Sequence, residues 1–278
     1  MSKRNVAYLG PPGTFSEEAA LKYDLEAQLI PFPSISAVTS AVETGIADEG
    51  VVPIENSLEG SVNDTLDLLI HESKLLIRRE LILDIEHHLL VKPGTSATEL
   101  SVIFSHPQAL AQCRRFLERC FPKAQIVAAL STAAAVEQMM AYSTPAAAIG
   151  NSRAAEIYGA QILAKNIQDR SPNVTRFVVL APKDLPSTGR DKTSLCFSFN
   201  DDRPGLLYGV LEEFAKYNIN LAKVESRPSK EALGKYIFLV DIEGHRQDRI
   251  IGEVLGRVQA KTSFFKVLGS YPKYQLKR

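Results

Sequence analysis

Up to about residue 180, short apolar runs alternate with longer stretches in which apolar residues recur every three or four positions. The short runs predict strands, and the longer stretches predict amphipathic helices. The predicted strands are Val6–Leu9, Glu49–Ile54, Val102–Phe104, Ala147–Ile149 and Phe177–Leu180. The predicted helices are Phe15–Tyr23, one introduced by the cap signal Ser61–Asp64, one beginning at Pro107, Ser131–Tyr142 and Asn151–Tyr158. Such alternation is typical of an α/β fold with mostly parallel strands.

The pattern changes between Glu80 and Val91, where the apolar runs are extended rather than helical. We interpret this stretch as the crossing of the chain into a second lobe, near residue 80, with a return crossing near residues 160–175. Two α/β lobes joined by paired crossings make a cleft, and clefts of this kind are favoured ligand sites.

A second change follows the segment Ala181–Arg190, which is rich in proline and charge and predicts a linker. Beyond it the order is strand, helix, strand, strand, helix, strand, which is the order of a ferredoxin-like α+β domain. The strands are Ser194–Phe199, Ile219–Ser226, Lys235–Glu243 and Phe264–Leu268, and the helices are Leu206–Tyr217 and Arg249–Ala260. We therefore expect a catalytic domain over residues 1–181, a linker over 182–191 and a second domain over 192–278.

The charge balance and the lengths of the apolar runs argue against several classes of protein. Lys plus Arg and Asp plus Glu both number 32, so the formal net charge is zero, which argues against a nucleic-acid binder or a membrane-surface protein. The apolar run Val6–Leu9 is too short for a signal peptide, and no run is long enough to span a bilayer. Three cysteines without a CxxC spacing indicate reduced thiols. The expectation is a soluble cytoplasmic protein that handles a small molecule.

The sequence lacks the motifs of several common kinds of catalytic and binding site. The five histidines form no HExxH and no Cys/His cluster, so we expect no metal, and there is no GxSxG nucleophile motif. Cys113 and Cys120 lie seven apart on one expected helix and are predicted to pack in the core. The run Gly10–Thr14 begins like a phosphate-binding loop but lacks its lysine. It leaves a turn into a helix N-terminus, which either holds a carboxylate or is a plain strand-to-helix turn.

Three polar segments stand where strands end or begin. Asn56 follows a strand and either faces the crevice or forms an Asx turn before Gly60. Gln108 and Gln112 share one helix face beside Ser105, which suits a carboxylate site or simple helix capping. The triplet Thr175-Arg176-Phe177 opens a strand with a hydroxyl beside a guanidinium, which could give a proton and hold a carboxylate.

The second domain carries charge at the end of a strand, over Asn220–Pro228. This pattern is also typical of an edge strand in which charge and proline prevent pairing with another chain, so it does not by itself indicate a binding site. RNA binding by a ferredoxin-like domain would need exposed aromatic residues on the sheet, which the sequence does not indicate.

Taken in order, these segments resemble the prephenate dehydratase family over essentially the whole chain, with a C-terminal ACT regulatory domain. The matching runs are Gly10–Ser16, Pro53–Ser57 with Gly60, Ser105–Gln108 with Gln112, and Asn173–Phe177. In the second domain, Glu225–Pro228 matches the ESRP motif of the family, while Gly205–Tyr208 keeps only part of its GALL motif.

The resemblance implies a two-lobed, periplasmic-binding-protein-like (type II) catalytic domain with the active site between its lobes. It also implies the conversion of prephenate to phenylpyruvate, water and CO₂ without a cofactor. Thr175 would donate to the leaving hydroxyl, and Arg176 would bind a carboxylate. The other substrate-binding residues would be Asn56, Ser105, Gln112, Thr14 and Glu55, the last being a possible proton source.

The resemblance further implies that ACT domains pair between subunits, as a homodimer or homotetramer, and bind phenylalanine for feedback inhibition. The residues near the effector would be Gly205, Leu207, Asn220, Glu225, Ser226 and Arg227. Two alternatives remain: arogenate dehydratase, which shares the ring chemistry, and a non-catalytic amino-acid-sensing binding protein.

Overall fold

The computed structural model describes residues 3–201, 203–230 and 234–275. The chain forms two compact units. The first runs from the N-terminus to Val62 and from Ile82 to Phe177. The second contains Asn63–Leu81 and the chain from Val178 to the C-terminus. The predicted boundaries at residues 1 and 278 lie outside the described residues.

The first sheet has the strand order β2-β1-β3-β11-β5, with β4 paired to β3. Its strands are β1 (Asn5–Leu9), β2 (Gln28–Phe32), β3 (Glu49–Asn56), β4 (Gly60–Ser61), β5 (Leu76–Asp84) and β11 (Val174–Ala181). The strand β1 is parallel to both β2 and β3. Helices α1 (Phe15–Tyr23) and α2 (Ile35–Glu43) begin at Thr14 and Ser34, whose hydroxyls cap them.

The second sheet belongs entirely to the first unit and has the order β10-β6-β9-β7-β8. Its strands are β6 (His88–Val91), β7 (Val102–Ser105), β8 (Gln125–Ala128), β9 (Ala146–Gly150) and β10 (Gln161–Ala164). The strand β7 runs parallel to β8 and β9, whereas β6 is antiparallel to β9 and β10. The chain thus passes from the first sheet to the second between β5 and β6, and returns between β10 and β11.

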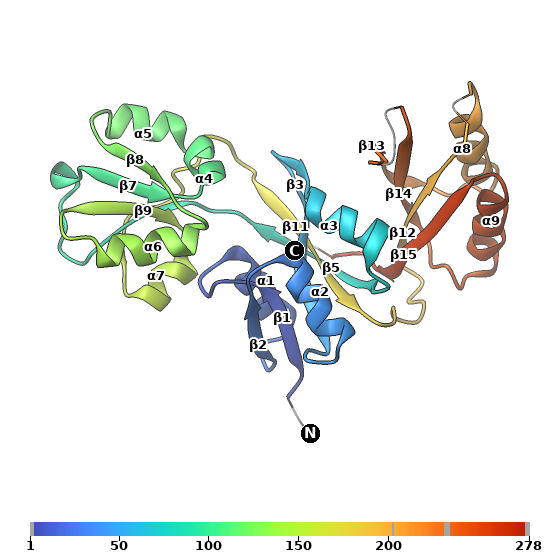
Figure 1. Cartoon of the computed structure of the whole chain (residues 1–278), viewed down its shortest axis with the longest axis horizontal. Coiled ribbons are helices and arrows are strands. Elements are labelled where there is room, and N and C mark those ends of the chain that lie inside the picture. The colour runs from blue at the N-terminus through green and yellow to red at the C-terminus, as the bar shows by residue number, and fades with distance from the viewer. Residues whose placement is uncertain (1–2, 202, 231–233, 276–278) are drawn as a thin grey trace. The chain divides into compact units, whose positions relative to one another are not determined.

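Helices cover both faces of the second sheet (Figure 1). On one side Leu90 and Phe104 pack against α6 (Thr132–Ala141) and α7 (Ser152–Tyr158). On the other side Leu89, Ile103 and Ile149 pack against α4 (Pro107–Gln112) and α5 (Arg114–Cys120). Because neighbouring side chains of a strand point to opposite faces, a strand buried on both sides must be apolar throughout. This explains why β6, β7 and β9 appear in the sequence as continuous apolar runs. A short 3₁₀ turn, η2 (Ala97–Glu99), lies between β6 and β7.

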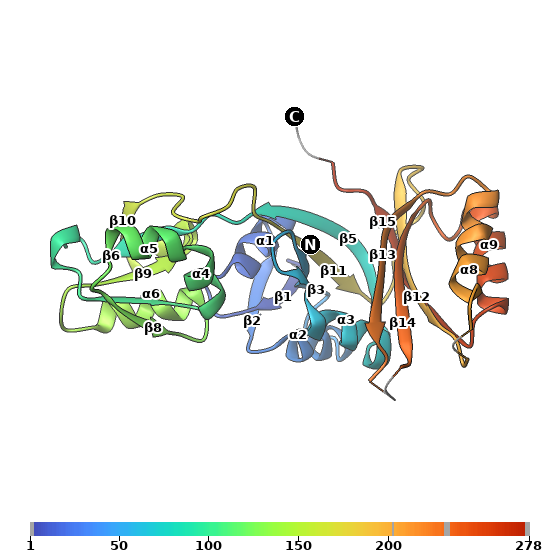
Figure 2. The same ribbon diagram turned by 90° about the horizontal axis from the view of Figure 1, so that it is seen from above.

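The second unit contains the predicted strand–helix–strand–strand–helix–strand domain. Its elements are β12 (Asp191–Ser198), α8 (Leu206–Lys216), β13 (Leu221–Pro228), β14 (Tyr236–Glu243), α9 (Arg249–Ala260) and β15 (Phe264–Pro272). The sheet order is β13-β14-β12-β15, antiparallel throughout. Both helices cover one face, where Phe197, Phe214 and Val254 meet (Figure 2).

The second unit also includes α3 (Asn63–Asp67) and the π-helix η1 (Leu68–Glu72), and η1 packs against β15. The Lys266 ammonium donates to three backbone carbonyls of this segment, those of Leu69, Ile70 and Ser73. A Cβ on Gly269 would lie 2.3 Å from the Ile77 carbonyl oxygen, so only glycine permits this approach. Residues 63–81 therefore pack with the C-terminal part of the chain although they lie within the N-terminal part of the sequence.

One core prediction is half wrong. Cys113 is buried, but Cys120 is exposed. The predicted single helix breaks at Cys113 into α4 and α5, so the seven-residue spacing does not keep both thiols on one face. In the part of the chain that the structure describes, no helix has the length and apolar character needed to cross a membrane.

Candidate active site

The hydroxyl of Thr175 lies against the side chain of Asn56. Asn56 ends β3 and Thr175 is the second residue of β11, and both are buried. The Asn56 Nδ2 donates to Thr175 Oγ1 at 2.9 Å. The Asn56 Oδ1 accepts the backbone N–H groups of Leu58 and Glu59 at 2.9 and 3.1 Å. The Asx turn, one of the two alternatives in the sequence, is therefore made by the Oδ1 of Asn56, while its Nδ2 is directed toward Thr175.

The direction of this hydrogen bond defines what Thr175 can do. The two backbone N–H groups hold Asn56 Oδ1 as the acceptor, so the Nδ2 group must face Thr175 as the donor. Thr175 Oγ1 accepts this bond with a lone pair. Its own proton is left to be donated to another oxygen.

Asn173 extends this arrangement to Gln112. Its Oδ1 accepts from Asn56 Nδ2 at 2.9 Å, and its Nδ2 donates to Gln112 Oε1 at 2.9 Å. The Gln112 Nε2 donates to the carboxylate of Glu59 at 3.1 Å. We call Asn56, Asn173, Gln112 and Thr175 the amide network. It connects three of the predicted site residues through neutral groups.

His87 contacts the far end of the amide network. Its Nε2 lies 2.9 Å from Gln112 Oε1, and the ring of Phe15 packs edge-on against it with centroids 5.7 Å apart. Burial lowers the pKa of His87; the hydrogen bond to Gln112 opposes this shift and the neighbouring His88 adds to it, both with smaller effects. The imidazole is therefore neutral near pH 7.

Ser105 and Thr14 have hydrogen-bond partners within the fold. Ser105 is fully buried, and its hydroxyl donates to the Ile149 carbonyl at 2.9 Å, which joins β7 to β9. The Thr14 hydroxyl donates to the Leu9 carbonyl and accepts the Glu17 N–H at the start of α1. Their predicted contacts with substrate stay predictions.

The N-terminus of α1 binds a carboxylate, but the carboxylate is the chain's own. The backbone N–H of Gly13 donates to Glu17 Oε2 at 2.6 Å. Gly13 has a φ of 86°, and a Cβ there would lie 3.2 Å from the Cα of Ala154. A glycine is therefore required where this loop meets α7.

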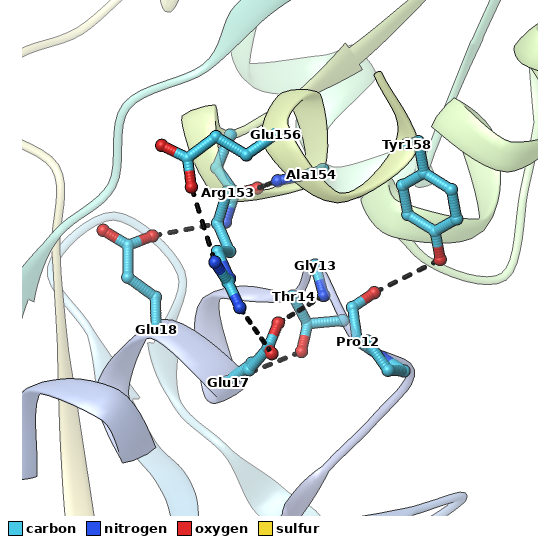
Figure 3. Close-up of polar contacts among 10 residues, drawn as sticks. Pro12, Gly13, Thr14, Glu17, Glu18, Arg153, Ala154, Glu156 and Tyr158 are labelled. Carbon is cyan, nitrogen blue, oxygen red and sulfur yellow. Dashed lines mark hydrogen bonds and ion pairs between the residues drawn. The ribbon is translucent and has the colours of Figure 1, made fainter. Parts of the chain in front are cut away.

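Further polar contacts join α1 to α7. Figure 3 shows Arg153 between the carboxylates of Glu17 and Glu156, at 3.3 and 3.4 Å. Asn151 donates to Glu18 at 3.2 Å; burial raises the pKa of Glu18, an effect that this hydrogen bond opposes. These contacts tie the helix that follows β1 to the helix that follows β9, and so connect the two lobes of the first unit.

Glu55 and Arg176 lie on the other face of their strands. Each is adjacent in sequence to a residue of the amide network, so strand alternation directs it to the opposite side. There the Arg176 Nη1 and the Glu55 carboxylate form an ion pair at 3.5 Å. The geometry pairs Arg176 with Glu55 and separates both from the Thr175 hydroxyl, against the expectation that hydroxyl and guanidinium act side by side.

Three residues of the site were not among the predicted site residues: Asn173, Glu59 and His87. Asn173 stands two positions before Thr175, and this period-two spacing is a signal that was available in the sequence. His87 and Glu59 carry no comparable signal, because they reach Gln112 from 25 and 53 positions away. Among the described residues, no group of three or more His, Cys, Asp or Glu side chains could hold a metal ion.

The predicted effector residues divide between two cavities of the second unit. Gly205 and Leu207 line a cavity of about 420 Å³ together with Phe238. Glu225, Ser226 and Arg227 line another, of about 360 Å³. Asn220 lines neither cavity; its backbone carbonyl accepts the N–H of Glu243.

Arg227 belongs to an ionic cluster, which we define as Asp67, Arg227 and Lys230. The Asp67 carboxylate forms ion pairs with Arg227 Nη2 at 2.7 Å and with Lys230 Nζ at 2.6 Å. Arg227 is buried, and its Nη1 has no hydrogen-bond partner among the described residues. Arg227 also lines the cavity that the ESRP residues form.

Comparison with known proteins matches both parts of the chain. The family model for prephenate dehydratase matches residues 6–185, and the model for the ACT domain matches residues 197–258. A bifunctional chorismate mutase/prephenate dehydratase from Aquifex aeolicus is 46% identical, over 98% of this chain and 74% of its own length. The chloroplastic arogenate dehydratase 5 of Arabidopsis thaliana is 42% identical, over 98% of this chain and 68% of its own.

A solved structure shares the whole fold. The prephenate dehydratase from Arthrobacter aurescens, in complex with L-Phe, superimposes with a TM-score of 0.89 at 35% identity. The match covers 97% of this chain and 90% of that chain. Family model, sequence relatives and structure agree, and the chain belongs to the prephenate dehydratase family.

Proposed function

We propose that this chain is a prephenate dehydratase in which Thr175 assists departure of the ring hydroxyl. The observation that supports this role is the bond from Asn56 Nδ2 to Thr175 Oγ1, which leaves the threonine proton to be donated. A hydroxyl oriented in this way is a preorganised donor for an oxygen that gains negative charge.

The reaction needs modest help from the protein. When the ring carboxylate leaves as CO₂, its electron pair enters the ring and the hydroxide on the opposite ring carbon departs. One proton is required to make that hydroxide water, and the product ring becomes aromatic, which supplies driving force. A threonine hydroxyl is a weak acid, so Thr175 stabilises the leaving oxygen by hydrogen bonding. Such assistance is typically worth ~10²–10⁴ in rate.

Asn56 and Gln112 position the substrate in this proposal, and Ser105 and Thr14 are assigned further contacts with it. Gln112 has one amide hydrogen on Glu59 and a second one to offer. Because Arg176 pairs with Glu55 on the opposite face, we assign this pair a supporting role beside β3 and β11. The reaction as written consumes no cofactor.

We assign catalysis to residues 1–181, a linker to 182–191 and regulation by L-phenylalanine to 192–278, in a cytoplasmic enzyme. The Arthrobacter relative was solved with L-Phe, and this chain has the same ACT domain. In this proposal L-phenylalanine binds where ACT domains of two chains pair, with the residues of the two effector-lining cavities supplied by different chains. This arrangement requires a homodimer or homotetramer.

A turnover assay of the purified protein on prephenate, with and without L-phenylalanine, tests the proposal. We expect phenylpyruvate to form and L-phenylalanine to suppress it. The absence of phenylpyruvate would instead favour a binding protein that senses amino acids. Arogenate is assayed in parallel because an arogenate dehydratase is among the relatives. A large preference for arogenate would assign the amino substrate.

A further inference from the structure

We propose that His87 is a positioning residue of this active site, which acts by fixing the orientation of the Gln112 amide. The inference rests on the proposed function, since it concerns how Gln112 meets the substrate. It starts from three contacts of one side chain: Gln112 with Glu59, Asn173 and His87.

The contact with Glu59 identifies which end of the Gln112 amide is the NH₂ group. A carboxylate only accepts hydrogen bonds, so the group 3.1 Å from Glu59 Oε1 is the Gln112 NH₂. Gln112 Oε1 therefore faces Asn173 Nδ2 and His87 Nε2, each at 2.9 Å. Both lone pairs of that carbonyl are used.

The same geometry decides the tautomer of His87. Because Gln112 Oε1 only accepts, His87 Nε2 must carry the ring proton. The His87 backbone is held as well: its N–H donates to Gln168 Oε1 at 3.0 Å and its carbonyl accepts the N–H of Ile167. His87 is 3% exposed, and its Nδ1 has no partner among the described residues. Burial lowers its pKa, in agreement with a neutral Nε2–H donor.

Loss of the His87 donor would leave Gln112 Oε1 with Asn173 alone. The amide plane would then be held by Glu59 and Asn173 only and would rotate more freely, which would misdirect the second hydrogen of Gln112 Nε2 away from the substrate. A hydrogen bond of this kind is typically worth ~0.5–1.5 kcal/mol, so we expect up to about a tenfold loss in kcat/KM.

Four variants test the inference in the full-length protein. His87→Phe keeps a planar ring without a donor, and its kcat/KM should fall up to about tenfold. His87→Gln can place an amide N–H near the position of Nε2 and should restore most of the loss. His87→Asn is the matched control, because its shorter amide does not reach Gln112. Gln112→Ala provides the background for a double-mutant cycle.

The cycle separates positioning from general destabilisation. In Gln112→Ala, the further change His87→Phe should leave kcat/KM unchanged, because its effect passes through Gln112. Additive losses, or equal losses in His87→Gln and His87→Asn, would overturn the inference.

A second readout does not depend on turnover. The side-chain NH₂ signals of Gln112, assigned by their loss in Gln112→Ala, should shift in His87→Phe and return in His87→Gln. If these signals behave so while the wild type fails to convert prephenate, the proposed function is wrong and the positioning role stands. Unchanged signals in His87→Phe would contradict the positioning role in either case.

Discussion

The amide network around Thr175 and the ionic cluster around Asp67 hold their side chains by different physical means. In the amide network each of the three amides donates and accepts, Thr175 accepts, and none of the four side chains carries a charge. In the ionic cluster one carboxylate is shared by two cations. Burying a neutral amide that has partners costs little, whereas a buried charge depends on its counter-ion.

This difference matches the two proposed ligands. A substrate that loses a carboxylate and a hydroxide needs donors whose direction is set in advance, and a chain of amides can transmit direction from backbone N–H groups to Thr175. An amino-acid effector brings a fixed carboxylate, for which the Arg227 guanidinium provides a matching charge. The comparison leads to four predictions.

The largest effect is expected at the end of the amide network. Thr175→Val removes the hydroxyl but keeps the β-branched shape, so kcat should fall at least ~10²-fold while the thermal unfolding midpoint changes little. Thr175→Ser, which keeps the hydroxyl, is the matched control and should retain much of the rate. Near-normal turnover of Thr175→Val would remove Thr175 from its role.

The next effect concerns the charge of the ionic cluster. Asp67→Asn leaves the buried Arg227 guanidinium without its counter-ion, so the free energy of unfolding should fall by about 1.5–3 kcal/mol in urea denaturation. Lys230 is 66% exposed on its side chain, and Lys230→Gln should cost under about 1 kcal/mol. Equal losses in both variants would show that burial does not distinguish the two cations.

A smaller effect is expected at Ser226, the exposed neighbour of Arg227 on β13. Ser226→Ala should raise the L-phenylalanine concentration for half inhibition about fivefold, the value of one hydrogen bond, with the uninhibited rate preserved. Inhibition curves of the variant and the wild type provide the measurement. Arg227→Lys should also relieve inhibition, because a lysine cannot hold Asp67 and an effector with one planar group. Unchanged inhibition in both would place the effector elsewhere.

The smallest effect is expected on the opposite face of β3. Glu55→Gln keeps the shape and removes the charge that pairs with Arg176, and kcat should change by less than about threefold because this face does not contact Thr175. A loss comparable to that of Thr175→Val in steady-state assays would identify Glu55 as the proton source.

Much of the fold was predictable because the pattern of buried side chains in a strand or helix is visible as a pattern of apolar residues along the sequence. Apolar runs buried on both faces became β6, β7 and β9, and Pro107 stands at the first turn of α4 as expected. Side chains next to one another in the sequence were harder to place. Thr175 and Arg176 look like one functional unit in the sequence, yet strand alternation directs them to opposite faces.

By itself, the sequence determined the family, the α/β class of the first domain and the order of elements in the second, and it predicted Asn56, Gln112 and Thr175 as site residues. These depend on periodicity and on motifs whose members lie close along the chain. Only the tertiary structure decided that His87 and Glu59 meet Gln112, and that residues 63–81 pack with the second unit. The physical reason is that hydrogen-bond direction and close packing depend on atoms brought together from distant positions, for which spacing along the chain carries no signal.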